Sequence, residues 1–169
     1  MEALRLTLGH RPLRAADLAE ICNWVENPAE SQFCFPGQRW PLAPEALGQA
    51  FQGFSSATLI LRRGEAVAFA DFCRAEVHGA CVLGHFLVAP EMRGLGIGRH
   101  LIEIMREQAR SRYHAREFRV SCHNANVAGL QFFPRFGLEP CGVEPYADPE
   151  GQPAVLIHFR QPLLPAPRF

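Results

Sequence analysis

The amino-acid sequence predicts a single α/β domain built around a mixed sheet. The chain has 169 residues, which is enough for one ordinary domain and too few for two domains with separate cores. Several short apolar stretches are separated only by turn residues, which is typical of hairpins. Others are joined by a helical pattern, which is typical of a strand–helix–strand crossover. No repeat and no long linker divides the sequence, so we expect residues 1–169 to form one domain.

The first half of the sequence is expected to contain a strand, two helices and then three more strands. Leucine alternates with polar residues over 4–8, which predicts the first strand. Helices are predicted over 15–25, where apolar residues share one face, and over 44–52, which starts at a proline. Residues 26–44 have no clear period and remain unassigned. The three following strands are predicted over 58–62, 66–77 and 80–88.

The second half is expected to alternate strands and helices. Residues 80–88 are apolar at seven of nine positions, which predicts a central strand buried on both faces. A long amphipathic helix is predicted from Ile97 onward, and Asn126 is expected to cap a short helix that ends or kinks near Pro134. Further strands are predicted over 118–122, 138–143 and 154–159, followed by a loose end over 161–167. Together these elements make a sheet of six or seven mostly antiparallel strands with about four helices.

Charge and composition exclude several classes of function. Basic and acidic residues both number 17, so the formal net charge is zero and the clustered basic excess of nucleic-acid binders is absent from the sequence. No apolar run has the length of a membrane span, and the first residues do not read as a secretory signal. The six cysteines lack the paired spacing of zinc ligands. We therefore expect reduced cysteines in a cytoplasmic protein, with no bound metal.

A glycine-rich turn between a buried strand and an amphipathic helix is the most informative segment. It reads Val88-Ala89-Pro90-Glu91-Met92-Arg93-Gly94-Leu95-Gly96-Ile97-Gly98-Arg99. Glycines let backbone N–H groups approach a bulky anion, and the helix N-terminus adds unpaired donors and the positive end of the dipole. The turn therefore suits a pyrophosphate. It lacks the Lys-Ser/Thr pair of a Walker loop, and Arg99 stands where a dinucleotide fingerprint needs glycine.

The same turn resembles a family motif. Arg93-Gly94-Leu95-Gly96-Ile97-Gly98 is similar to the Q/R-x-x-G-x-G/A acetyl-CoA motif of the GNAT acetyltransferase family. Downstream, Asn126, Phe133 and Gly137-Leu138 resemble the family's N-x-x-A-x-x-x-Y-x-x-x-G-F helix. The resemblance covers about residues 67–143. It implies a GNAT-like fold and an N-acetyltransferase that moves acetyl from acetyl-CoA to a primary amine by direct attack in a ternary complex.

The resemblance also implies which residues hold acetyl-CoA. The backbone of Phe86, Leu87 and Val88 would pair with the pantetheine arm as an added strand would, where the strands ending at Val88 and Cys122 splay apart. The N–H of Val88 would face the thioester as an oxyanion donor, and Asn126 would hydrogen-bond the pantetheine or thioester end. The complete expected set is Phe86, Leu87, Val88, Arg93, Gly94, Leu95, Gly96, Ile97, Gly98, Arg99, Asn126 and Phe133.

Four positions depart from the family pattern. The usual tyrosine, which protonates the departing thiolate, is Phe133 and has no proton to give. The alanine three residues after the asparagine is Gly129, and Pro134 interrupts the helix. Acetylases of ribosomal-protein N-termini carry a glutamate base where this sequence has Ser121, which disfavours that subfamily.

Candidate acid–base groups are few. A general base helps because an amine with a pKa of about 10.4 is almost fully protonated at pH 7. His85 is the one titratable side chain of the central strand, either as that base or as a histidine packed on the face away from Phe86 and Val88. Tyr146 is a candidate acid from a late loop.

The remaining candidates carry two interpretations each. His123 follows the neighbouring strand, at the mouth of the cleft or simply on the surface. Cys122 is a buried thiol rather than a nucleophile, since no base lies beside it in the sequence. Phe35 and Trp40 are expected to line the acceptor pocket, with a lid over the core as the alternative.

The sequence predicts an acetyl-CoA-dependent N-acetyltransferase with a small-molecule or protein amine as acceptor. The alternatives are an acyl-CoA-binding sensor that has lost its acid, and a glycine turn that binds no CoA. Neither nucleic acid nor membrane is expected as a partner, and a homodimer remains open.

Overall fold

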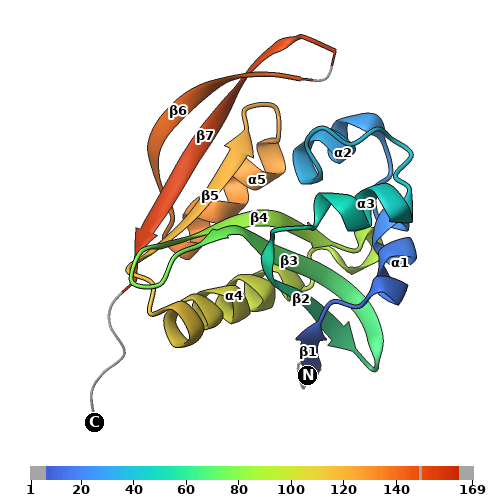
Figure 1. Ribbon diagram of the computed structural model, residues 1–169, viewed down its shortest axis with the longest axis horizontal. Coiled ribbons are helices and arrows are strands. Elements are labelled where there is room, and N and C mark those ends of the chain that lie inside the picture. The colour runs from blue at the N-terminus through green and yellow to red at the C-terminus, as the bar shows by residue number, and fades with distance from the viewer. Residues whose placement is uncertain (1–6, 149, 164–169) are drawn as a thin grey trace.

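A computed structural model describes residues 7–148 and 150–163 as a seven-stranded sheet with helices on both faces (Figure 1). The strand order is β1-β2-β3-β4-β5-β7-β6. The elements in chain order are β1 (Leu8–Pro12), α1 (Leu18–Asn23), α2 (Pro28–Cys34), α3 (Pro44–Ala50), β2 (Ser55–Arg62), β3 (Glu65–Ala75), β4 (Ala80–Val88), α4 (Ile97–Tyr113), β5 (Glu117–His123), α5 (Val127–Phe132), β6 (Glu139–Ala147) and β7 (Pro153–Pro162).

The predicted α/β class and mixed sheet are confirmed. Every neighbouring pair of strands is antiparallel except β4 and β5, which the crossover helix α4 joins in parallel. The first strand begins later than predicted, and residues 4–6 lie outside the described part of the chain. Residues 161 and 162, expected in a loose end, belong to β7, and 164–167 lie outside the described residues.

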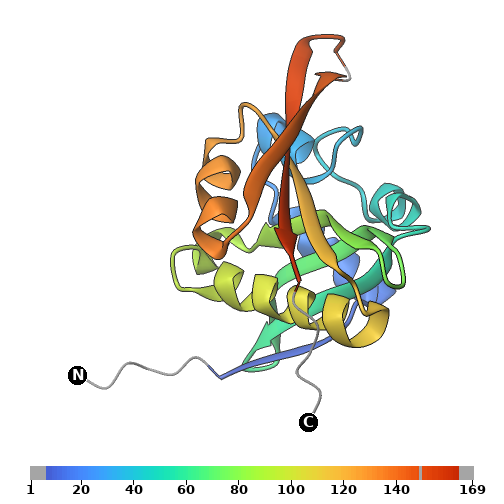
Figure 2. The same ribbon diagram turned by 90° about the vertical axis from the view of Figure 1, so that its left-hand side faces the viewer.

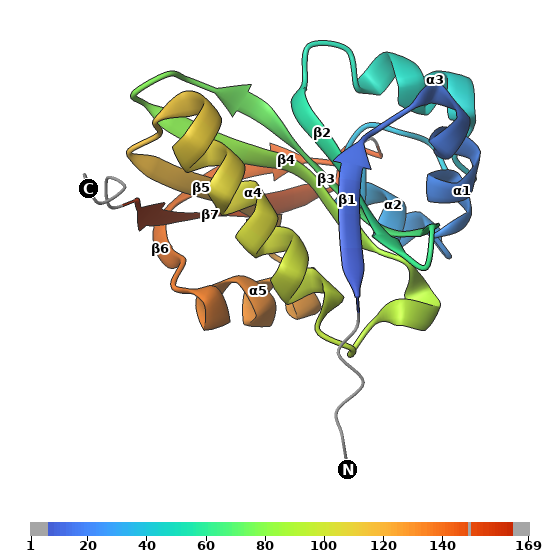
Figure 3. The same cartoon turned by 90° about the horizontal axis from the view of Figure 1, so that it is seen from below.

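Two hydrophobic cores lie on opposite faces of the sheet. One packs α4, α5 and the turn that follows α5 against side chains of β3, β4 and β5. The other packs α1, α3 and the end of α2 against β2, β3 and β4. Seen from below, α4 crosses one face while α1 and α3 lie beyond the opposite one (Figure 3). The hairpin of β6 and β7 extends past the remaining strands (Figure 2), and most of β6 is exposed.

Helix α2 lies in the segment that the sequence left unassigned. Asn27 caps it, since its Oδ1 accepts a hydrogen bond of 2.9 Å from the N–H of Glu30, and Pro28 occupies the first turn. These start signals are present in the sequence, but the helix is only seven residues long, too short for a clear apolar period.

A β-bulge bends the central strand. Ala70 pairs with Phe86 and Phe72 pairs with Leu83, so Gly84 and His85 together lie opposite the single residue Asp71. The strand is central, as predicted, but it is not buried evenly on both faces. Buried residues alternate along it with half-buried ones, because its outer part lies beside an open pocket.

Candidate functional site

A large pocket lies where β4 and β5 separate. Their parallel pairing ends at Leu83 and Val120, directly before the bulge, as expected for a splayed pair of strands. Beyond that point a cavity of about 970 Å³ opens between β4, the start of α4, α5 and α2. A volume of this size accommodates an extended ligand of cofactor dimensions.

The free edge of β4 faces this pocket. The N–H of Ala89 donates to the carbonyl of Val67 on the β3 side at 2.9 Å. Because N–H directions alternate along a strand, the backbone groups of Phe86 and Val88 point to the other side, toward the gap beside β5. The Val88 carbonyl there accepts a 3.1 Å hydrogen bond from the Arg93 Nε. The remaining groups of this edge are available to a ligand that adds like a strand.

The glycine-rich turn forms one end of the pocket. Gly94 and Gly96 have φ values of 76° and 83°, a left-handed conformation that favours glycine. Gly96 is the N-cap of α4, and an added Cβ at either glycine would meet no atom within 4 Å. The first turn of α4 contains no acidic residue. The turn therefore presents open backbone donors and the positive helix end to an anion.

Two arginines add positive charge beside this turn. Arg99 and Arg135 both line the pocket, and Arg99 is only loosely held by Glu103 at 3.3 Å. Sequence reasoning missed Arg135, because it lies in the turn after α5 and reaches the pocket only through the fold. The predicted ligands from Phe86 to Val88, Arg93, Gly94, Gly96, Gly98 and Arg99 are brought together here, whereas Leu95 and Ile97 are not among the lining residues.

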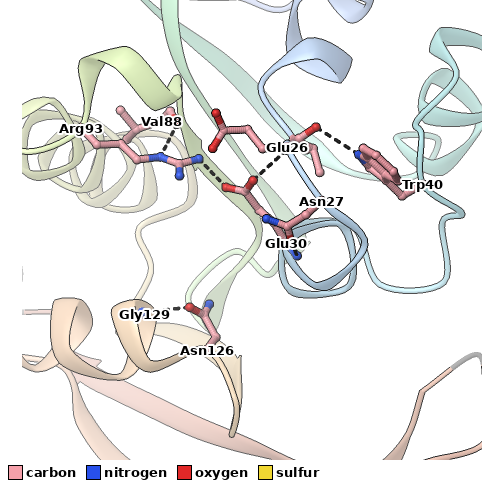
Figure 4. Close-up of polar contacts among 9 residues, drawn as sticks. Glu26, Asn27, Glu30, Trp40, Val88, Arg93, Asn126 and Gly129 are labelled. Carbon is pink, nitrogen blue, oxygen red and sulfur yellow. Dashed lines mark hydrogen bonds and ion pairs between the residues drawn. The ribbon is translucent and has the colours of Figure 1, made fainter.

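Asn126 and Gly129 shape the start of α5. Asn126 Oδ1 accepts a 3.1 Å hydrogen bond from the Gly129 N–H, while the residue also lines the pocket (Figure 4). The Asn126 Nδ2 donors thus remain for a ligand. A Cβ at Gly129 would lie 2.7 Å from both Asn126 Nδ2 and Cys122 Sγ. The family's alanine does not fit at position 129 without displacing the asparagine.

The expected break at Pro134 is confirmed. Helix α5 ends at Phe132, and residues Phe133–Phe136 form a 3-10 turn. Phe133 is 6% exposed, lines the pocket and meets the ring of Phe86 edge-on at 5.7 Å. It therefore supplies shape to the pocket and no proton.

Residues in and just before helix α2 line another side of the pocket, next to Arg93. Glu26, Asn27, Glu30 and Phe33 line it from this side. Glu30 forms an ion pair with Arg93 and accepts a 2.9 Å hydrogen bond from the Glu26 N–H, while the Glu26 carboxylate extends toward Val88 and Arg93 (Figure 4). Sequence reasoning missed these residues. The signal in the sequence that could have indicated them is the helix start Asn27-Pro28-x-Glu30.

An aromatic group joins α2 to the β6–β7 hairpin. The ring of His123, at the end of β5, lies 5.2 Å from Phe33 and 6.0 Å from Tyr146. His123 Nδ1 accepts a 3.0 Å hydrogen bond from the Ala125 N–H, so the neutral ring carries its proton on Nε2. His123 therefore lies at the mouth, while Tyr146 reaches this group and does not line the pocket itself.

His85 lies away from the pocket. It is 6% exposed, and its Nδ1 lies 2.7 Å from the fully buried Asp71 carboxylate, which also accepts a 2.8 Å hydrogen bond from the His85 N–H. The rings of Phe54, Phe35 and Phe51 surround it at 4.7, 4.9 and 5.0 Å. Strand alternation turns His85 to the face opposite Phe86, as the packed interpretation predicts.

The two predicted acceptor aromatics also lie elsewhere. Phe35 is 1% exposed and belongs to the core around α1 and α3. Trp40 is 42% exposed, and its Nε1 donates to the Val25 carbonyl at 3.2 Å. Neither lines the pocket. Phe33 lines the pocket instead, because α2 turns its ring toward His123 at the end of β5.

Burial disfavours the thiolate form of the two thiols near the pocket. Burial raises the pKa of Cys122 to about 11. Burial and the neighbouring Glu30 raise the pKa of Cys34 to about 12. Both therefore stay protonated near neutral pH. Among residues 7–148 and 150–163, no three metal-ligating side chains are grouped, and no helix is long and apolar enough to cross a membrane.

Comparison with known proteins agrees with this geometry. The acetyltransferase (GNAT) family matches residues 18–138. A comparison with curated protein sequences finds no match.

Several solved structures share the fold. The acetyltransferase from Salmonella typhimurium that modifies the N-terminal serine of ribosomal protein L7/L12 is 17% identical, with 95% of this chain and 98% of that chain covered and a TM-score of 0.78. Spermidine N-acetyltransferase from Vibrio cholerae, in complex with CoA and spermine, is 15% identical over 92% and 95%, with a TM-score of 0.73. Ribosomal-protein-alanine N-acetyltransferase from Brucella melitensis is 22% identical over 92% and 99%, with a TM-score of 0.70. With its glycine turn, open strand edge and family match over most of its length, the chain belongs to the GNAT family of acetyl-CoA-dependent N-acetyltransferases.

Proposed function

We propose that this enzyme acetylates a primary amine by direct attack on acetyl-CoA held in the pocket beside β4. The observation that carries the proposal is the continuity of one open strand edge with a left-handed glycine turn at a helix N-terminus. The pantetheine arm would pair with the backbone of Phe86 and Val88. The pyrophosphate would meet the N–H groups from Gly94 to Arg99.

The acceptor amine is proposed to arrive from the side of α2 and the β6–β7 hairpin. Glu26 lines the pocket there, whereas the carboxylate of Glu30 is already engaged by Arg93. A carboxylate in this place attracts an ammonium group and favours its approach to the thioester. We infer that Glu26 positions the amine and accepts its proton, directly or through water.

The departing thiolate needs little general acid catalysis. A thiol has a reference pKa of about 8.5, so it departs without full protonation. Phe133 has no proton to donate. Tyr146, beside His123, or a water molecule is the proposed donor. His85 is assigned to the bulge instead of to proton transfer, because Asp71 and three phenylalanines enclose it.

We also propose that the enzyme acts in the cytoplasm. All six cysteines are free thiols in the structure, which suits a reducing compartment. The sensor alternative has no observation in its favour.

The test is acetylation of a panel of amines, comprising peptides with free N-termini, peptides with internal lysine and small polyamines. Mass spectrometry of the products is preferable to a thiol reagent, because exposed Cys73 and Cys141 would react with the reagent. The chain contains no lysine, so self-acetylation of lysine side chains cannot consume the donor. Turnover with at least one amine is expected. Acetyl-CoA binding without turnover on any amine would contradict the proposal.

A further inference from the structure

A second cavity lies on the sheet face opposite α4, over strands that α1, α2 and α3 do not cover. It has a volume of about 460 Å³ and is formed by side chains of β3 through β7. No carboxylate is among its lining residues, although three arginines and a histidine are. The polar members are Cys73, Arg74, Arg119, Ser121, Cys141, His158 and Arg160.

The strand register places the three arginines in one row. Arg74 pairs with Val82, Val82 pairs with Arg119, and Arg119 lies directly opposite Arg160. Residues that face each other across strands share a face of the sheet, and like charges placed directly opposite destabilise it. An anion bound beside this row would reduce the repulsion between the arginines.

The positive charge of this row is only partly compensated. Glu117 forms an ion pair with Arg119, and Glu76 lies 3.4 Å from Arg74. Glu139 lies opposite Arg160 in the register, yet Arg160 forms no ion pair within the described residues. Arg160 is exposed at the edge of the cavity and free to bind a ligand.

A chain of hydrogen bonds fixes a histidine at the next row. Ser121 Oγ lies 2.7 Å from His158 Nδ1, and His158 Nε2 lies 3.1 Å from the Glu144 carboxylate. Because the Glu144 carboxylate accepts a hydrogen bond from the Nε2–H of His158, the ring keeps one orientation beside the arginine row. The Ser121 hydroxyl is thereby held at the cavity wall, where it adds a neutral polar group to the charged ones.

This face leads to the mouth of the donor pocket. Arg119, Ser121 and His123 are alternate residues of β5 and therefore point to the same side of the sheet. At roughly 3.3 Å per residue, about 13 Å separates Arg119 from His123 along the strand. His123 contacts Phe33, which lines the pocket. An extended acceptor of roughly four residues would reach from the mouth to the arginines.

We propose that Arg74, Arg119 and Arg160 form a binding site for an oxyanion, a carboxylate or phosphate group carried by the acceptor. The preferred substrate would then be an amine with an acidic group about four residues away. This inference rests on the proposed acetyl transfer for the identity of the ligand, but the anion site itself is testable without turnover.

The first arm of the test measures inorganic phosphate binding by NMR on the full chain. Saturable shifts of the Arg119, Ser121 and Arg160 amides are expected. Arg160→Gln should weaken binding by about tenfold or more, since it removes a charge-assisted contact. Arg112→Gln, which removes an exposed charge from α4, is the matched control and should bind phosphate as the wild type does. No saturable shift, or an equal loss in both variants, would overturn the site.

The second arm identifies the source of the anion. Peptides with the same free N-terminus and a single Glu or Gln at one of the third to sixth positions are compared as acceptors. A lower KM for one Glu peptide, lost in Arg160→Gln with kcat unchanged, supports the acceptor assignment. Equal KM values for every Glu and Gln pair, with phosphate binding intact, would overturn that assignment in favour of a free anion. Phosphate binding without turnover on any amine would contradict the proposed acetyl transfer and leave the anion site supported.

Discussion

The proposed donor half of the active site and the proposed acceptor half are built in different ways. The donor half consists mainly of backbone: the open edge of β4, two left-handed glycines and the first turn of α4. The acceptor half consists of side chains from α2, β5 and β6, which meet only because the fold brings them together. Sequence variation in the donor half is restricted chiefly at the two left-handed glycines, whereas the acceptor half depends on the identity of each side chain.

The largest effect is expected at the bulge, where the Asp71 side chain supports the donor strand. Asp71→Ala would leave the His85 N–H and imidazole without their buried partner. We expect a loss of about 3 kcal/mol or more in the free energy of unfolding, together with weaker acetyl-CoA binding, because the bulge precedes the free edge. Urea unfolding measures the loss of stability, and titration calorimetry of the folded protein measures the acetyl-CoA affinity. Asp71→Asn, which keeps one acceptor of the same size, should lose less. A wild-type urea midpoint for Asp71→Ala would show that the carboxylate does not hold the bulge.

The glycine turn tests the backbone character of the donor half directly. Gly96→Asp should reduce acetyl-CoA affinity by about 100-fold or more, since a carboxylate beside the backbone donors repels the pyrophosphate. Gly96→Asn is the matched control, because both residues tolerate φ values near +83° to a similar degree and differ only in charge. The affinity of the Asn variant should fall much less. Equal affinities of the two variants, measured by calorimetry, would count against an anion at this turn.

The same contrast explains which features the sequence predicts. The glycine turn and the break at Pro134 follow from local patterns, since glycine and proline act within a few residues. The splayed strands, by contrast, are implied by the family resemblance. Phe133, which the family resemblance places at the cofactor, lines the pocket. The family resemblance further indicates which residues between Val88 and Asn126 would hold acetyl-CoA.

The acceptor half was not predictable in this way. Phe35 and Trp40 were chosen as the aromatic residues of an irregular segment, but a short helix places Phe33 in the pocket and buries Phe35 in the core. The arginine row depends on register between β3, β4, β5 and β7, which single-strand patterns do not reveal. The sequence leaves two interpretations for His85, a base or a packed histidine. The packed one is found because Asp71, fourteen residues away, lies opposite the bulge and contacts the imidazole.

The ion pair between Arg93 and Glu30 links the two halves. Glu30→Gln removes the charge while keeping the side-chain size and one acceptor for the Glu26 N–H. Because Arg93 is 43% exposed, the stability loss should be at most about 1 kcal/mol. If α2 is positioned through Arg93, the KM for the amine should rise several-fold while the Kd for acetyl-CoA stays nearly constant. Steady-state kinetics with both substrates varied makes the distinction, and an unchanged amine KM would show that the halves are independent.

The smallest expected effect is that of Phe133→Tyr, which restores the family's hydroxyl to the donor pocket. The ring volume is retained, so the Kd for acetyl-CoA should stay within about twofold of the wild type. General acid catalysis is typically worth about 10²–10⁴-fold when the acid is aimed at the leaving group. Phe133 lies in a 3-10 turn after α5 has ended, however, so its ring is not carried by the regular helix that the family's tyrosine occupies.

A gain in kcat of less than about tenfold is therefore expected for Phe133→Tyr, because only part of that acid catalysis can be recovered. Phe51→Tyr, which adds a hydroxyl to a partly buried ring on the opposite face of the sheet, controls for the cost of a hydroxyl in the core. A gain near 10³-fold would mean that the hydroxyl is well aimed and that the wild type lacks an acid altogether. An unchanged kcat would favour Tyr146 or water as the donor already in use, and loss of the remaining activity in Tyr146→Phe would then separate the tyrosine from the water.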